Sequence, residues 1–238
     1  MSGAWALAAR EFMSYFRTPI GWLVGAVWLL IGGVVFVESA LVPGEAASMR
    51  GFFAAAWALL VVVAPALSMR SLSEELRTGT IEPLMSAPVG EWALVLGKYL
   101  GALGFLVVCL VPTLAYVAVL TSLAAPDPGP IAAGYLGVTL TGGLYLALGV
   151  LLSGLTASQT LAFLSTLFAL LVVEVGLGVV APYLPEAWAR AALALSINRR
   201  AADFARGLID LWTVGYFLVA ILWALGLSAI TLRARRWR

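Results

Sequence analysis

The chain has 238 residues, of which 63% are hydrophobic and 11% are charged, and its mean hydropathy is +1.03. Soluble globular domains use about 45–50% apolar residues, so the composition excludes an ordinary soluble domain and indicates one polytopic membrane domain over residues 1–238. The formal net charge is only +2, and the sequence has no histidine, which disfavours His-dependent catalysis and removes the commonest metal ligand. We therefore expect no catalytic residues, no metal site and no cofactor.

The first predicted element is an amphipathic helix ahead of the membrane. In the stretch WALAAREFMSYFRTP, apolar residues recur at helical spacing, namely Trp5, Ala8, Phe12 and Tyr15 or Phe16. Pro19 is expected to end the helix. Such a segment is typical of an interfacial helix on the inner leaflet. A cytoplasmic extension of the first span is the other interpretation.

Six apolar runs follow, and each approaches the 20 or so residues that a helix needs to cross a bilayer core of about 30 Å. They are Ile20–Val37, Gly51–Met69, Tyr99–Ala124, Ile131–Leu152, Leu161–Tyr183 and Leu211–Leu232. The polar stretch SGLTASQT, Ser153–Thr160, divides the fourth run from the fifth. The sequence thus predicts an all-α fold with six transmembrane helices, an N-terminal interfacial helix and short external helices between the fifth and sixth spans.

The distribution of Lys and Arg indicates the orientation of these spans. With both termini cytoplasmic, nine of the 14 basic residues lie on the inner side, including the four arginines of 233–238. Four arginines between the fifth and sixth spans oppose this bias. We expect a multi-pass protein of the bacterial cytoplasmic (inner) membrane with both termini cytoplasmic.

The most charged stretch, residues 74–103, lies between the second and third spans. Gly79 is expected to break a helix there, Thr80 to cap a new short helix, and Glu82 to meet the positive end of its dipole. Pro88 is expected to end that helix. Three apolar residues share one of its faces at i, i+3 and i+4: Ile81, Leu84 and Met85. The predicted product is one or two turns of amphipathic helix projecting from the membrane, a shape suited to docking.

Eight residues within EELRTGTIEPLMSAPVGEWALVLGK form a pattern: Glu75, Gly79, Thr80, Glu82, Leu84, Pro88, Gly97 and Lys98. The pattern resembles the first cytoplasmic loop of the ABC-2 family of ABC transporter permeases. The resemblance extends over almost the whole chain, and its ending, FARGLIDLWTVGYFLVAILWALGLSAITLRARRWR, is similar to gliding-motility-type and copper-enzyme-maturation-type permeases. Pro83 departs from the family, which more often has a helix-favouring apolar residue at that position.

In this family the permease carries no ATPase, and the loop helix resembles the coupling helix that fits a cleft on a separate ABC ATPase subunit. The resemblance implies a coupling role for ten residues: Glu74, Glu75, Arg77, Gly79, Thr80, Ile81, Glu82, Leu84, Met85 and Pro88. It implies a permease subunit of an ATP-driven exporter, working as a homodimer or heterodimer in the lipid bilayer and without nucleic acid. An ATP-independent secondary transporter or channel and a membrane scaffold that recruits an ATPase are the other interpretations.

Glu174 is the one ionisable residue well inside a predicted span. Insertion scales assign a carboxylate at the centre of a span a cost of about 2.5–3.5 kcal/mol, so Glu174 is expected to face a protein interior or a wet cavity. Three interpretations stay open: an ion pair with an external arginine, a protonated and hydrogen-bonded acid, and a place on the translocation path.

The segment between Pro182 and Asp210 predicts two short amphipathic helices, with Asn198 capping the second and Gly207 ending it. In the ABC-2 family the equivalent region resembles an external gate. Surface helices without a gating role are the alternative. The segment supplies two further candidates for the path or gate, Arg199 and Arg200.

Overall fold

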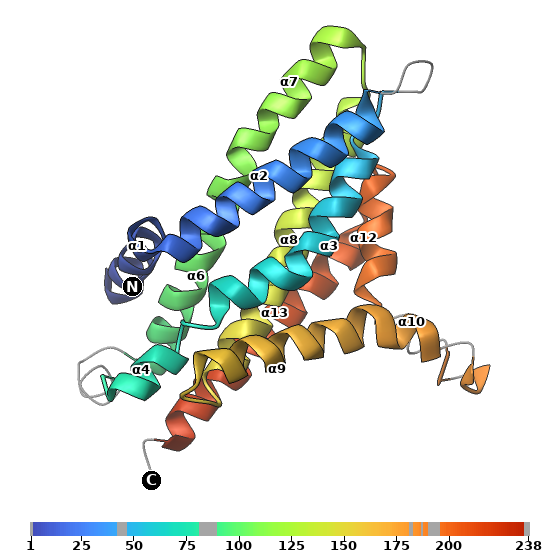
Figure 1. Cartoon of the computed structure of the whole chain (residues 1–238). Helices are drawn as coiled ribbons and strands as arrows, with labels where there is room; N and C mark the ends of the chain where they lie inside the picture. Colours follow the sequence, from blue (N-terminus) through green and yellow to red (C-terminus); the bar gives the residue numbers. More distant parts are fainter. Residues whose placement is uncertain are drawn as a thin grey trace.

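The computed structural model describes residues 2–41, 47–80, 90–180, 183–186, 188–189 and 196–235, and every regular element among them is a helix (Figure 1). Within these residues, six helical segments are long and apolar enough to cross a membrane: Pro19–Ala40, Arg50–Thr78, Glu91–Leu123, Pro128–Ser153, Gln159–Gly176 and Leu211–Ala234. Each overlaps one of the predicted spans. The predicted all-α, six-span architecture is confirmed.

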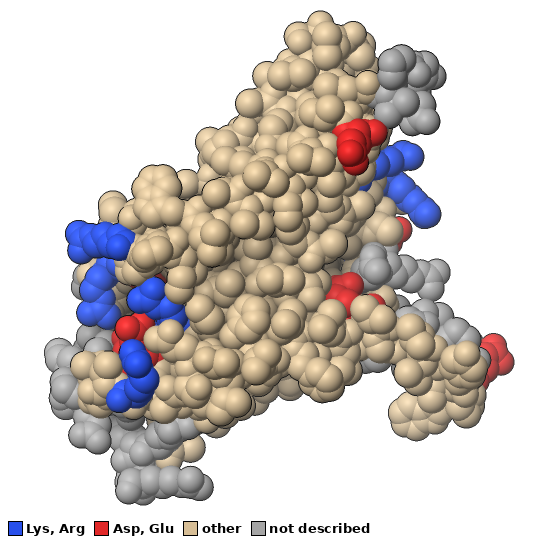
Figure 2. All heavy atoms as spheres, in the orientation of Figure 1, with Lys and Arg blue, Asp and Glu red and all other residues tan. Residues whose placement is uncertain are grey.

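Charge is distributed as a bilayer requires. On the face shown in Figure 2, most coloured side chains gather at the two ends of the bundle, and the surface between them is largely tan. Large apolar side chains are exposed along the spans, for example Leu30 in the first and Phe168 in the fifth. Such an apolar surface is stable where lipid, and not water, surrounds it.

The N-terminal helix α1 (Ser2–Arg17) is separate from the first span, α2 (Pro19–Ala40). Thr18 has an extended backbone, with φ of −112° and ψ of 143°, because a residue before proline avoids the helical region. Pro19 then occupies the first turn of α2, where its missing N–H costs no hydrogen bond. The chain therefore turns at Thr18, and α1 packs along the third span.

The second span is α3 (Arg50–Ser68), and a turn joins it to the short helix α4 (Ser73–Thr78). Gly79 ends α4 with φ of 70°, the left-handed conformation that glycine adopts at little cost. The predicted helix break at Gly79 is confirmed. The predicted coupling helix, and with it Ile81, Glu82, Leu84, Met85 and Pro88, lies outside the described residues.

The third span is made of α6 (Glu91–Leu110), the 3₁₀ turn η1 (Val111–Thr113) and α7 (Leu114–Leu123). Pro112 lies in η1, which interrupts the α-helix at this point because proline lacks the N–H that the helix needs. The span begins at Glu91, earlier than the predicted start at Tyr99.

The fourth span, α8 (Pro128–Ser153), is the central helix and packs against α3, α6, α9, α12 and α13. Small residues allow these close approaches. A Cβ atom added at Gly142 would lie 2.4 Å from Leu106 Cδ2, and one added at Gly149 would lie 1.8 Å from Ser68 Oγ. The glycines of this span thus let the neighbouring helices pack closely against α8.

The fifth span combines α9 (Gln159–Leu171), the π-helical segment η2 (Val172–Gly176) and α10 (Leu177–Val180). Further along lies the short helix α12 (Ile197–Ala205), and the sixth span is α13 (Leu211–Arg235).

The ends of α12 test the prediction made for the external helices. Gly207, with φ of 84°, follows the end of α12 as predicted, and the N–H of Leu208 reaches back to the carbonyl of Asp203. The predicted cap at Asn198 is wrong, because the helix already begins at Ile197, after an extended Ser196. Most of the predicted first external helix lies outside the described residues.

Candidate functional site

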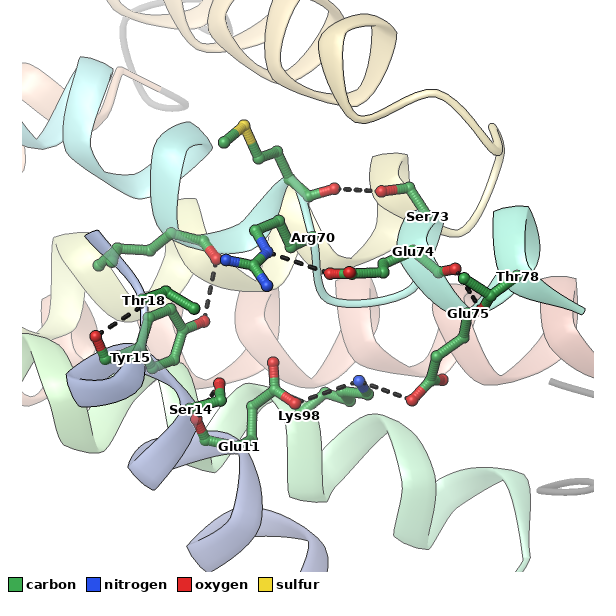
Figure 3. A network of polar contacts seen from close by, with 12 residues as sticks. Glu11, Ser14, Tyr15, Thr18, Arg70, Ser73, Glu74, Glu75, Thr78 and Lys98 are labelled. Carbon is green, nitrogen blue, oxygen red and sulfur yellow. Dashed lines mark hydrogen bonds and ion pairs between the residues drawn. The ribbon is translucent and has the colours of Figure 1, made fainter. Parts of the chain in front are cut away.

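A buried cluster of charges joins three helices at the end of the bundle that carries α1 (Figure 3). Lys98 Nζ, from α6, lies 3.1 Å from Glu11 Oε2 of α1 and 2.8 Å from Glu75 Oε1 of α4. The side chains of Lys98, Glu11 and Glu75 are only 7%, 13% and 10% exposed. Arg10 Nη2 approaches Glu75 Oε1 at 3.7 Å from the solvent side. We call Arg10, Glu11, Glu75 and Lys98 the Lys98 ion cluster.

Glycines of α6 make this cluster possible. A Cβ atom at Gly97 would lie 2.6 Å from Leu7 Cβ, and one at Gly101 would lie 2.6 Å from Glu11 Cβ. Because these glycines have no side chains, α1 lies directly against the backbone of α6. Lys98 lies between these two glycines in α6. The close approach of α1 therefore brings the carboxylate of Glu11 within reach of the Lys98 ammonium group.

Short contacts also fix α4 to the end of α3. Arg70 Nε lies 3.1 Å from Glu74 Oε2, one helical turn apart in sequence, and the hydroxyl of Ser73 donates to the carbonyl of Met69. Glu74 and Glu75 stand in the first turn of α4, where a helix favours negative charge. The helix that leads into the loop is therefore held at its N-terminal end.

Tyr15 gives α1 a second attachment. Its hydroxyl donates to the carbonyl of Leu67 in α3 at 2.9 Å, and its ring stacks on Phe105 of α6 with centroids 4.9 Å apart. Burial raises the pKa of Tyr15 above its usual value, and the nearby Glu11 carboxylate raises the pKa further. The hydroxyl therefore stays neutral and keeps its hydrogen bond, so α1, α3 and α6 form one support beneath α4.

The predicted coupling residues divide into two groups within the described part of the loop. Glu75 is buried and Glu74 half-buried, and both are held by cations of this chain. Arg77, Gly79 and Thr80 are exposed. The structure thus places the first pair inside the support and the other three on the surface.

Sequence reasoning did not assign Arg10, Glu11, Tyr15 or Arg70 to this site. The signal for Glu11 was present, because it is the one acidic residue of a largely apolar helix and Lys98 stands in an equally apolar run. Two opposite charges that avoid lipid are expected to meet. The 87-residue separation hides that pairing until the helices are packed.

A second set of polar residues lies near Glu174, which is part of η2. The hydroxyl of Tyr145, from the central helix α8, donates a hydrogen bond to Glu174 Oε1. Arg200 of α12 places its guanidinium carbon 4.2 Å from the ring centroid of Tyr216 in α13. The backbone of Arg199 lies in α12, and its side chain lies outside the described residues. The structure thus brings Glu174 against Tyr145, and Arg200 against Tyr216.

A groove of about 860 Å³ lies beside Glu174. Residues of α3, of the fifth span and of α12 line it, with Arg50 and Arg206 as its two cations. Its other lining residues are apolar: Ala54, Trp57, Ala58, Val61, Val62, Leu167, Leu171, Val175, Ala202 and Ala205. The groove therefore offers one carboxylate in a mainly apolar wall.

Among the described residues, six spans with α8 as the central one, a buried ion cluster at one end and an apolar groove toward the other define a multi-pass helical membrane protein. The family model of the ABC-2 family transporter protein matches residues 5–232, and the chain belongs to this family. It is a membrane permease of an ABC transporter, from a family that works with an ABC ATPase and is not itself catalytic. No curated protein matches the chain. The resemblance to the family is confirmed, and the subgroup stays a prediction.

Proposed function

We propose that the chain, as a single permease domain over residues 1–238, couples ATP hydrolysis by a separate ABC ATPase to export across the bacterial cytoplasmic membrane. Both termini are cytoplasmic in this proposal, and two permease subunits work with two ATPase subunits. The observation that carries the proposal is the 2.8 Å contact between Glu75, where the loop begins, and the buried Lys98 of the third span.

This contact supports coupling because it is short, buried and branched. Lys98 holds Glu75 of α4 and Glu11 of α1 at once, and Arg70 holds Glu74 at the end of α3. A displacement of α4 therefore moves three helices together. Glu74 and Glu75 position the loop, while the exposed Arg77, Gly79 and Thr80 face the ATPase, together with the apolar face of Ile81, Leu84 and Met85.

The route of the cargo is proposed along the groove beside Glu174. The carboxylate stands in a π-helical segment, a local widening of the helix that often marks a functional site. The short helix α12 lies over the central helix and carries Arg199 and Arg200. We assign α12 to an external gate, in which a shift of Arg200 on the ring of Tyr216 accompanies opening.

The coupling role is tested with a pair of glycine variants that flank the loop. Gly79→Val forces a β-branched residue to a φ of 70°, whereas Gly90→Val keeps φ at −65°, which any residue adopts, and both sites have open space around Cβ. The measurements are co-purification of the permease with its ATPase and substrate-stimulated ATP hydrolysis in the same membranes. Gly79→Val should reach the membrane and lose coupling, and Gly90→Val should behave as the parent.

Parental recruitment and transport by Gly79→Val would remove the loop from the coupling role. If the parent protein itself recruited the ATPase but transported nothing, the chain would be a scaffold. Transport that continues without the ATPase would identify a secondary transporter or channel.

A further inference from the structure

The outward face of α1 carries a pattern of its own. Ala8 and Tyr15 are buried on the opposite face of the helix. At about 100° per residue, the outward apolar residues occupy an arc of about 100°, and Arg10 and Arg17 lie together at one edge of that arc. The exposed residues of the helix are Trp5, Ala6, Ala9, Arg10, Met13, Phe16 and Arg17. A broad apolar sector with a basic edge is the arrangement of a helix that lies in a membrane interface.

The contacts of α1 hold this face at the level of the membrane surface. A single residue, Thr18, separates α1 from the first span. The indole N–H of Trp22, in the first turn of that span, donates to the carbonyl of Phe16 at 2.9 Å. The end of α1 is thereby tied to the start of the first span, and Trp5 and Met13 are exposed on the outward side of the helix.

The charge on the exposed edge is entirely positive. Glu11 is the one acidic residue of α1, and it turns inward to Lys98 at 3.1 Å. Arg10 and Arg17 are left exposed at the edge. Two guanidinium groups beside an apolar sector complement a phosphate headgroup above an acyl chain.

We propose that α1 binds the headgroups of anionic phospholipids through Arg10 and Arg17, and that the headgroup competes with Glu75 for Arg10. Arg10 is 60% exposed and lies 3.7 Å from Glu75 Oε1, while Lys98 lies 2.8 Å from the same oxygen. Glu75 therefore keeps its closer cation when Arg10 turns to a headgroup. The lipid site stands independently of the proposed function.

The binding step is tested by lipid retention. The purified permease is placed in nanodiscs of equimolar phosphatidylcholine and phosphatidylglycerol, and the lipid that remains bound after detergent extraction is counted by native mass spectrometry. Phosphatidylglycerol retention should fall about fivefold for each arginine removed in Arg10→Gln and Arg17→Gln. Arg10→Lys should keep most of it. Arg77→Gln, which removes an exposed cation from α4, is the charge-matched control and should leave phosphatidylglycerol retention unchanged in this assay, which contains no ATPase. Parental retention by the double variant Arg10→Gln/Arg17→Gln would overturn the proposal.

The competition step is tested by hydrogen exchange of the α4 amides, residues 73–78. Exchange in the parent should be faster in nanodiscs that contain phosphatidylglycerol than in pure phosphatidylcholine, because Arg10 leaves Glu75. In Arg10→Gln the exchange should be fast in both bilayers. An equal response to phosphatidylglycerol in Arg10→Gln would refute the competition. Inorganic phosphate added to the neutral nanodiscs should not change the exchange rate of the α4 amides. If phosphate accelerated exchange as much as phosphatidylglycerol does, the ligand of Arg10 would be a free anion and not a lipid headgroup.

Neither measurement contains the ATPase. A failed lipid site therefore leaves the coupling proposal standing, and a failed coupling loop leaves the lipid site standing.

Discussion

The two carboxylate sites of this permease, one buried and one half-buried beside a groove, differ in how their charge is compensated. At the α1 end, Glu11 and Glu75 share one ammonium group, Lys98, and the three side chains come from three helices. In the fifth span, Glu174 receives a hydrogen bond from the neutral hydroxyl of Tyr145. The first site neutralises its charges inside the chain, whereas the second leaves an acid beside a groove. The first site holds three helices together, and the second leaves Glu174 open to the groove along which we propose that the cargo passes.

The two sites also differ in the regularity of the helix that carries them. Lys98 lies in the regular helix α6, and the glycines beside it bring α1 against the backbone. Glu174 lies in a π-helical segment, whose wider turn gives up regular hydrogen bonding. A site that transmits displacement needs stiff neighbours, and a site that changes partners tolerates a less regular backbone. Substitutions that remove one partner at each site measure how much each contact contributes to stability.

The largest loss of stability is expected for Lys98→Met. It leaves the carboxylates of Glu11 and Glu75 buried without their shared cation, and breaking a buried pair in this way costs about 3–5 kcal/mol. Reversible unfolding in mixed micelles measures the loss.

The control is the triple variant Glu11→Gln/Glu75→Gln/Lys98→Met, which removes all three charges and should recover most of the stability. Unfolding of Lys98→Met at the parental denaturant concentration would mean that the cluster is solvated, and that it does not stiffen the junction.

A smaller loss is expected for Tyr145→Phe. The change removes the hydroxyl that donates to Glu174; this hydrogen bond contributes about 1.5–3 kcal/mol to an ionised Glu174 and about 0.5–1.5 kcal/mol to a protonated one. The same unfolding assay reports it. Tyr135→Phe, on the same helix, is the matched control, because its hydroxyl pairs with the neutral hydroxyl of Thr113 at 2.9 Å and its loss should cost about 0.5–1.5 kcal/mol.

A cycle with Glu174→Leu separates the contact from the rest of the tyrosine. In the Glu174→Leu background, Tyr145→Phe should cost much less than it does in the parent. Equal costs in both backgrounds would show that the hydroxyl stabilises α8 by other contacts, and Glu174 would then need another partner.

Much of the fold was predictable because membrane spans obey a simple rule of length and polarity. The six runs needed only counting, since a bilayer tolerates few charges over about 20 residues. Local stops were also readable, because Pro19 and Gly79 act through their own backbone and need no distant partner. The misplaced cap at Asn198 shows the limit of such rules, since Ser196 two residues earlier was equally able to precede the helix.

The candidate site was predictable only in part. The family resemblance implied a coupling role for Glu74 and Glu75, but it did not indicate that Arg70 and Lys98 of the same chain hold them. Those pairings depend on how α1 and α4 pack against α6, which no local spacing encodes. Glu174 was found because it breaks the apolar run, whereas Tyr145 is one of several tyrosines in the spans and carries no signal of its own.

The smallest effect is expected for Arg70→Gln, which removes the other ion pair of α4. The side chains of Arg70 and Glu74 are 28% and 37% exposed, so water already solvates both charges. Exposed pairs of this kind contribute about 0–1 kcal/mol, several times less than Lys98. Because salt at 1 M shortens the screening length to about 3 Å, the cost of Arg70→Gln should vanish there, while that of Lys98→Met should persist. Unfolding both variants at low and high salt measures the difference, and Glu74→Gln, which removes the other partner, is the control for Arg70→Gln. If Arg70→Gln cost as much as Lys98→Met, and did so at both salt concentrations, burial would not be what separates the two ion pairs.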